Sequence, residues 1–97
     1  MDDHESKKDR VVHAAFGCRT ELLTYARSLL GNFAAAEDAV QEAMIVVMNK
    51  HDQFQEGTSM LAWCRSIVRL EVLRAKRRHQ QDVSLAQRLL DDAVDAA

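Results

Sequence analysis

The stretch that decides the fold is FAAAEDAVQEAMIVVMNK, residues 33–50 of a chain of 97. Successive residues of a helix are turned by about 100°, so residues three and four apart share a face. One face of a helix through this stretch collects small and apolar side chains: Ala36, Ala39, Val40, Ala43 and Val47. The opposite face collects polar side chains and two apolar ones: Asp38, Gln41, Glu42, Ile45 and Met48. We therefore predict a helix over residues 33–50 that is buried on one side.

The polar face of this helix has two interpretations, and its residues alone leave both open. It can be an ordinary solvated face, on which Glu37 and Asp38 favour the positive end of the helix dipole. It can also be a partner surface, because Ile45 and Met48 lie among polar residues and would form an apolar centre with a charged rim. A partner helix that carries Arg or Lys would fit the second interpretation.

The chain before this stretch predicts another helix, over residues 9–30, behind a flexible polar N-terminus at residues 1–8. Its apolar side chains recur at spacings of three and four: Val11, Ala15, Cys18, Leu22, Tyr25 and Leu29. We expect this stripe, and also Phe16, to lie in the core. Gly31 suits the left-handed residue that follows such a helix, and Asn32 suits the N-cap of the next one.

The chain after residue 50 predicts a loop and then one or two more helices. Residues 51–57 break the helical pattern, and Thr58 or Ser59 can cap a helix that runs to about His79. The apolar stripe of this helix consists of Leu61, Cys64, Val68, Val72 and Ala75. A further amphipathic segment follows Ser84, with apolar residues at Leu85, Leu89, Leu90 and Val94.

Length and composition fit one helical domain. The chain has no proline and only three glycines, so little in it interrupts a helix. We predict an all-α fold, a bundle of three to four helices over residues 9–80. Residues 81–97 would be the start of a linker or a short fourth helix.

Charge is distributed unevenly along the chain, although the formal net charge is only −2. Residues 61–79 contain six Lys or Arg and one Asp or Glu, whereas residues 80–97 contain one and four. One or two cations suit the negative end of a helix dipole, but a larger number repel one another unless an anion is near. Phosphate is the natural anion, so this segment predicts a nucleic-acid contact. The basic residues are Arg65, Arg69, Arg74, Lys76, Arg77 and Arg78.

The two aromatic residues around the loop each have two open interpretations. Trp63 can belong to the core or can stack on a base. Phe54 can anchor the loop to the core or can border a base pocket. Thr58 and Ser59 are most simply helix caps.

The sequence carries no pattern of catalysis or of cofactor binding. Its four histidines lack the spacing of a zinc site, there is no glycine-rich phosphate loop, and no nucleophile has an identifiable base. We therefore expect no enzyme activity, no metal and no cofactor. The charged N-terminus does not resemble a signal peptide, and no apolar run could span a membrane. These features predict a cytoplasmic protein in which Cys18 and Cys64 are reduced.

Residues 22–78 resemble region 2 of sigma-70-family factors of RNA polymerase, of the small extracytoplasmic-function type. The matching pieces are Ala36-Glu37-Asp38-x-x-Gln41-Glu42, Phe54-x-x-Gly57-Thr58, Ala62-Trp63, Ile67-x-Arg69 and Arg77-Arg78. The segment from Arg69 to Arg74 is similar to that of a planctomycete-type subgroup.

This resemblance implies a role for each surface. The helix that carries Asp38, Gln41 and Glu42 would dock on the clamp helices of the polymerase β′ subunit, with Ile45 and Met48 joining the interface. Residues 54–59 would receive a base flipped out of the non-template strand. The basic helix over residues 65–78 would contact the minus-ten promoter element and stabilise the melted DNA. An anti-sigma factor is a further expected partner.

The chain departs from the family pattern at two positions and in its length. Many members have Asn at the position of Leu70 and Asp at that of Arg74, so we expect Arg74 to meet phosphate. The family normally continues through a linker to a second, helix-turn-helix domain, and residues 81–97 would begin that linker.

Two other functions fit the residues without the resemblance. One is a small helical adaptor that binds a basic protein and no DNA. The other is a stand-alone helix-turn-helix reader of duplex DNA, although the tight turn between short helices is missing.

Overall fold

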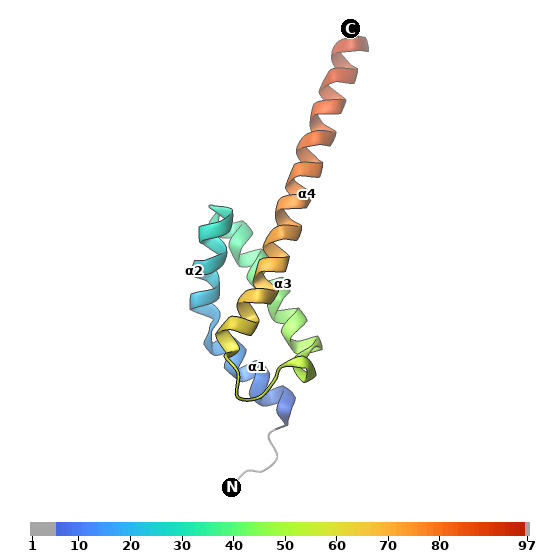
Figure 1. Cartoon of the computed structure of the whole chain (residues 1–97). Helices are drawn as coiled ribbons and strands as arrows, with labels where there is room; N and C mark the ends of the chain where they lie inside the picture. Colours follow the sequence, from blue (N-terminus) through green and yellow to red (C-terminus); the bar gives the residue numbers. More distant parts are fainter. Residues whose placement is uncertain (1–5, 97) are drawn as a thin grey trace.

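The computed structural model describes residues 6–96, and the first residues of the expected flexible N-terminus lie outside that range. Residues 6–96 form four α-helices and one short 3₁₀ helix (Figure 1). The helices are α1 (Lys7–Gly17), α2 (Arg19–Leu30), α3 (Phe33–Asn49) and α4 (Met60–Ala96), with η1 (His51–Gln53) after α3. The prediction of an all-α bundle is confirmed.

The predicted helix over residues 9–30 is wrong in one respect, because it is broken into α1 and α2 at Cys18. The backbone of Cys18 is not helical (φ −93°, ψ 2°), and its N–H donates to the carbonyls of Ala15 and Phe16. Gly17 lies directly before the break, and glycine costs about 1 kcal/mol relative to alanine inside a helix. α1 also begins earlier than predicted, at Lys7, where the Ser6 hydroxyl accepts a hydrogen bond from the Asp9 N–H at 3.1 Å.

The connection between α2 and α3 follows its sequence signals. Gly31 adopts the left-handed conformation (φ 66°), which glycine enters without a Cβ penalty. The Asn32 side-chain oxygen accepts a hydrogen bond from the Ala35 N–H at 3.0 Å. Both predicted end signals are therefore confirmed.

The core lies where α3 packs against α2 and α4. α3 buries the five residues of its predicted apolar face and also Met44. From the other helices come Val11, Ala15, Leu22, Ala26, Cys64, Ile67, Val68 and Val72. The prediction that Phe16 belongs to the core is wrong, because α1 turns Val11 and Ala15 to the core and leaves Phe16, about 100° away from Ala15 on the helix, 46% exposed. Tyr25 is half-buried against the core.

The loop between α3 and α4 is held at three points. The ring of Phe54 is buried in the core, with 6% of its surface exposed. Lys7 Nζ donates to the carbonyl of Asp52 at 3.1 Å, and Arg10 forms an ion pair with Glu56 at 3.2 Å. α1 therefore holds the loop in place through two side chains, Lys7 and Arg10.

Of the two predicted caps of α4, Ser59 is the one that acts. Its hydroxyl accepts a hydrogen bond from the Ala62 N–H at 3.1 Å. The Thr58 hydroxyl instead donates to the carbonyl of Gln55 at 2.6 Å, within the loop.

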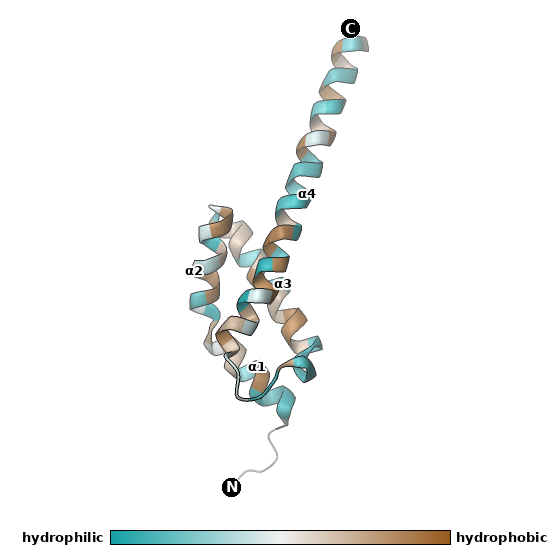
Figure 2. Ribbon diagram, viewed as in Figure 1, coloured by the Kyte–Doolittle hydropathy of each residue, from teal (hydrophilic) through white to brown (hydrophobic). Residues whose placement is uncertain are grey.

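α4 is much longer than predicted and continues to Ala96 without a break near His79. No glycine or proline follows Gly57, so no backbone signal ends the helix. We call residues 60–75 the proximal half of α4 and residues 76–96 its distal half. All of the distal half is exposed. It leaves the bundle as a single rod on which hydrophilic and hydrophobic residues alternate (Figures 1 and 2).

Candidate functional surfaces

The outer face of α3 presents the side chains that its sequence predicted. Asp38, Gln41 and Glu42 are exposed, Ile45 is 46% exposed, and Met48 is half-buried. The opposite side of the same helix is buried in the core, so this face is positioned by a rigid element. It combines carboxylates with an apolar centre, which is the composition of a protein-binding surface.

One further acidic residue of α3 is already paired. Glu37 lies 3.6 Å from Arg19 of α2 in a half-exposed ion pair. Exposed ion pairs of this kind contribute little to stability. Because its charge is balanced locally, Glu37 adds less to the field of the face than Asp38 and Glu42 do.

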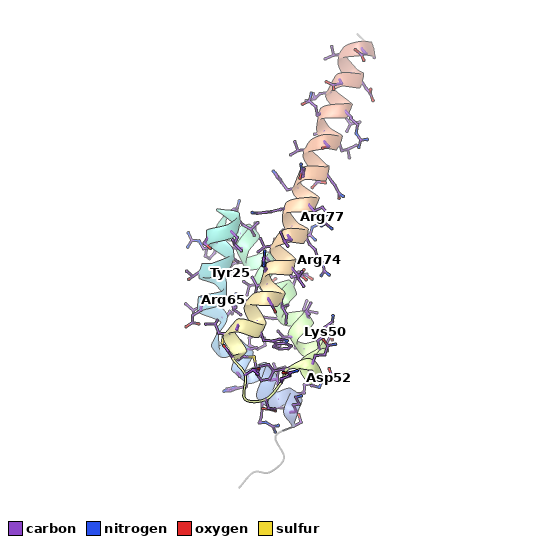
Figure 3. The ribbon with its side chains drawn as sticks, in the orientation of Figure 1. Tyr25, Lys50, Asp52, Arg65, Arg74 and Arg77 are labelled. Carbon is purple, nitrogen blue, oxygen red and sulfur yellow. The ribbon has the colours of Figure 1, made fainter. Side chains whose placement is uncertain are left out.

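The six basic residues of α4 from Arg65 to Arg78 are all exposed, but they lie on two sides of the helix. Arg65, Arg69 and Lys76 follow the side that faces α2, where the Arg65 guanidinium lies 5.4 Å from the centre of the Tyr25 ring. Arg74 and Arg77 lie on the other side of α4, the side on which Lys50 at the end of α3 also lies (Figure 3). The basic residues therefore form two rows along α4 rather than one patch.

A cleft lies between α4 and the end of α3, beside the second row. Its volume is about 450 Å³. It is lined by Val46, Lys50, Gln53, Trp63, Ser66, Ile67, Leu70, Glu71 and Arg74. The cleft thus combines an indole ring with two cations, an amide and a carboxylate, which are groups able to stack on a base or bond to its edge.

One wall of this cleft holds a buried carboxylate. Glu71 is 6% exposed, and its Oε2 accepts a hydrogen bond from Arg74 Nη1 at 2.6 Å. A buried carboxylate needs such a partner, because desolvation penalises an unpaired charge. Arg74 therefore orders the wall of the cleft as well as adding charge to it.

The aromatic residues Phe54, in the loop, and Trp63, in the first turn of α4, pack against each other in a tilted arrangement. The rings of Phe54 and Trp63 lie 5.3 Å apart at an interplanar angle of 55°. Of the two interpretations of Phe54, the structure favours an anchor that holds the loop to the core, since the Phe54 ring is buried. Trp63 is half-buried, with one part against the core and another lining the cleft.

A comparison with known families assigns the chain. The family described as Sigma-70 region 2 matches residues 18–82, about two thirds of the sequence. The chain belongs to the sigma-70 region 2 family. Region 2 binds core RNA polymerase and the minus-ten promoter element, and it is not an enzyme. No curated protein and no solved structure gives a significant match.

The match to region 2 has a definite place in the fold. It begins at Cys18, so it spans α2, α3, the loop, the proximal half of α4 and the first residues of its distal half. α1 and the end of α4 lie outside it. The family assignment disfavours the two alternatives, because region 2 binds both core polymerase and the minus-ten promoter element.

Several residues of this region 2 became visible only in the structure. Lys50 and Gln53 reach the cleft from the end of α3 and from η1, which no periodicity indicated. Glu71 had a signal, since it is the one acid within residues 61–79 and lies four residues after Ile67 on the buried side.

Metal and disulfide chemistry find no support among the described residues of region 2. Residues 6–96 contain no group of three or more His, Cys, Asp or Glu side chains placed to hold a metal ion. Cys18 and Cys64 are both free thiols. Burial, with a smaller contribution from Cys18, raises the pKa of Cys64 to about 11.

Among the helices of residues 6–96, none combines the length and the apolar composition that a membrane span requires.

Proposed function

We propose that this region 2 docks through the outer face of α3 on the clamp helices of the polymerase β′ subunit. The supporting observation is the composition of that face: Asp38 and Glu42 form an acidic rim around Ile45. Basic side chains of a partner helix would pair with the rim, while its apolar side chains would cover Ile45 and Met48. Buried apolar contacts supply most of the affinity of such interfaces, and charge pairs supply specificity and orientation.

We further propose that the melted non-template strand of the minus-ten element follows α4. The two basic rows would hold its phosphates, and the cleft between α4 and the end of α3, beside the second row, would take an unstacked base. We place the base in this cleft rather than within residues 54–59, because Phe54 is buried. Trp63 is the platform for stacking, and Gln53, which is exposed and lines the cleft, can bond to the edge of the base.

The single observation that carries this function is the separation of two chemistries in one small domain. α3 and the proximal half of α4 pack on each other through their apolar sides. Their outer faces, one acidic and one basic, are therefore left for different partners. A domain built in this way can hold polymerase and DNA at the same time.

The finer assignment to the extracytoplasmic-function type, with planctomycete-like character, rests on the motif pieces and on the segment from Arg69 to Arg74. An anti-sigma factor would be expected to cover one of the two outer faces. Because the protein would act with RNA polymerase on promoter DNA, we expect it to be cytoplasmic.

Two binding experiments test the proposal. In the first, a β′ clamp-helix fragment is titrated with the wild-type chain and with the double variant Asp38→Lys, Glu42→Lys, which should lose binding. In the second, single-stranded minus-ten DNA is bound in the presence of core polymerase, and Arg69→Ala with Arg77→Ala should weaken it. Unchanged binding of the acidic-face variant to the fragment would falsify docking through α3.

A further inference from the structure

Phe16 is an exposed aromatic residue that the function of region 2 has not yet explained. It lies on α1, outside the residues that match the family, and 46% of its surface is exposed. Large exposed aromatic rings commonly mark binding surfaces, because they bury much apolar area with little loss of side-chain freedom. Its neighbours show which surface this is.

Two shallow depressions adjoin Phe16 between α1 and α3. One, of about 470 Å³, is lined by Lys8, Asp9, Val12, His13, Phe16 and Met48. The other, of about 360 Å³, is lined by Phe16, Arg19, Gln41, Met44, Ile45 and Met48. Because both depressions share Phe16 and Met48, they form one groove, which we call the α1–α3 groove.

The α1–α3 groove is continuous with the proposed docking face. The face and the groove share three residues, Gln41, Ile45 and Met48. A partner helix that covers the outer face of α3 would therefore also contact the groove. The floor of the groove is apolar, with Val12, Phe16 and Met44. Charged and polar residues of α1 and α2 surround it, which gives the apolar centre and polar rim of a protein interface.

We propose that α1 is part of the polymerase-docking surface and that the α1–α3 groove takes an apolar side chain of the docked helix. The partner is an amphipathic helix of core polymerase. Its basic side chains meet Asp38 and Glu42, and an apolar side chain further along packs between Phe16, Ile45 and Met48. This inference rests on the proposed docking through α3, and it adds a helix that the family match does not include.

The test compares two phenylalanines of nearly equal exposure. Phe33, the first residue of α3, is 49% exposed, lies under Arg27 and lines neither depression. Full-length wild type, Phe16→Ala and Phe33→Ala are titrated against core polymerase in a fluorescence competition assay. We expect Phe16→Ala to weaken binding about tenfold or more, as loss of an aromatic anchor does. Phe33→Ala should stay within about twofold.

The outcomes separate this inference from the proposed function. If Phe16→Ala binds as wild type while Asp38→Lys with Glu42→Lys does not, the inference is wrong and docking through α3 stands. If none of these variants changes binding, docking itself is wrong. Equal weakening by Phe16→Ala and Phe33→Ala would also overturn the inference, because the loss would then be unspecific.

A double variant tests whether Phe16 and Ile45 hold the same partner side chain. If they do, Phe16→Ala combined with Ile45→Ala weakens binding by less than the product of the two single effects. If the loss of binding of the double variant equals the product of the two single losses, Phe16 and Ile45 make separate contacts, which contradicts the shared groove. Thermal unfolding of each variant reports any loss of folding, and Phe16→Leu, which keeps an apolar side chain, should restore part of the binding.

Discussion

The two halves of α4 follow the same amphipathic pattern in different surroundings. The proximal half buries its apolar stripe against α2 and α3, whereas the distal half exposes Leu85, Leu89, Leu90 and Val94 along its whole length. Their charges differ as well, since the proximal half is basic, whereas the distal half begins with Lys76, Arg77 and Arg78 and becomes acidic towards Ala96. Periodicity therefore predicts which face of a helix is apolar, but not whether anything covers it.

The largest expected effect distinguishes the halves by stability. Val68 in the proximal half is fully buried, and Val83 in the distal half is 54% exposed. Val68→Asp places an unpaired charge in the core and should cost more than about 4 kcal/mol, enough to unfold a small domain. Val83→Asp should change the free energy of unfolding by less than about 0.5 kcal/mol. Urea unfolding followed by circular dichroism measures both, and a similar loss for both variants would show that the distal half is also packed.

The next effect depends on pH and belongs to the proximal half alone. Burial raises the pKa of Cys64 to about 11 from an ordinary value of 9.0, so the unfolded chain loses this thiol proton first. The stabilisation is fully present below about pH 9 and is lost as the pH rises through 11. Over that range the wild type should lose roughly 2 kcal/mol more than Cys64→Ala. Urea unfolding at several pH values measures the difference, and parallel curves for the two proteins would contradict it.

A smaller effect concerns DNA and compares cations between Arg65 and Arg78 with a cation near the end of α4. Arg69→Ala with Arg77→Ala should weaken binding of single-stranded minus-ten DNA in the presence of polymerase. It should also reduce the slope of log K against log salt by roughly 0.7 for each lost phosphate contact. Arg88→Ala, a matched change further along the distal half, should leave the slope unchanged. Equal effects would extend the DNA path along the whole of α4.

The smallest expected effect on global stability comes from Ser84→Gly in the distal half. Glycine costs about 1 kcal/mol relative to alanine in helix propensity and serine about half of that, so this change of roughly 0.5 kcal/mol should lower the helical signal and speed amide exchange after residue 84. The midpoint of cooperative unfolding should not move, because no packed contact is lost. A shifted midpoint would mean that the distal half takes part in the folding of the bundle.

Local signals predicted much of the fold, and tertiary packing decided the rest. The buried face of α3 and the connection at Gly31 and Asn32 depend on neighbours in sequence, and both predictions are confirmed. The break at Cys18 was missed because the apolar stripe continues across it, and only Gly17 marked it. The end predicted near His79 was wrong because a change in polarity does not end a helix that has no glycine or proline.

The candidate surfaces were predicted to a different extent. The residues on the outer face of α3 follow from helical periodicity, and their docking role stays a prediction. The cleft beside α4 could not be predicted, because Lys50 and Gln53 join it only when α3 and η1 pack against Trp63 and Leu70. The exposure of Phe16 likewise depends on which face of α1 packs against the core.

The contacts between α1 and the loop have a consequence for the order of folding. They join Lys7 to Asp52 and Arg10 to Glu56, residues about 45 positions apart, whereas α2, α3 and α4 follow one another closely. Closing so long a segment costs entropy before it gains contacts. We expect α1 to dock last and to detach first, releasing the loop that precedes Trp63. Native-state hydrogen exchange should then show α1 opening at a lower free energy than α3, and equal protection of the two helices would contradict this order.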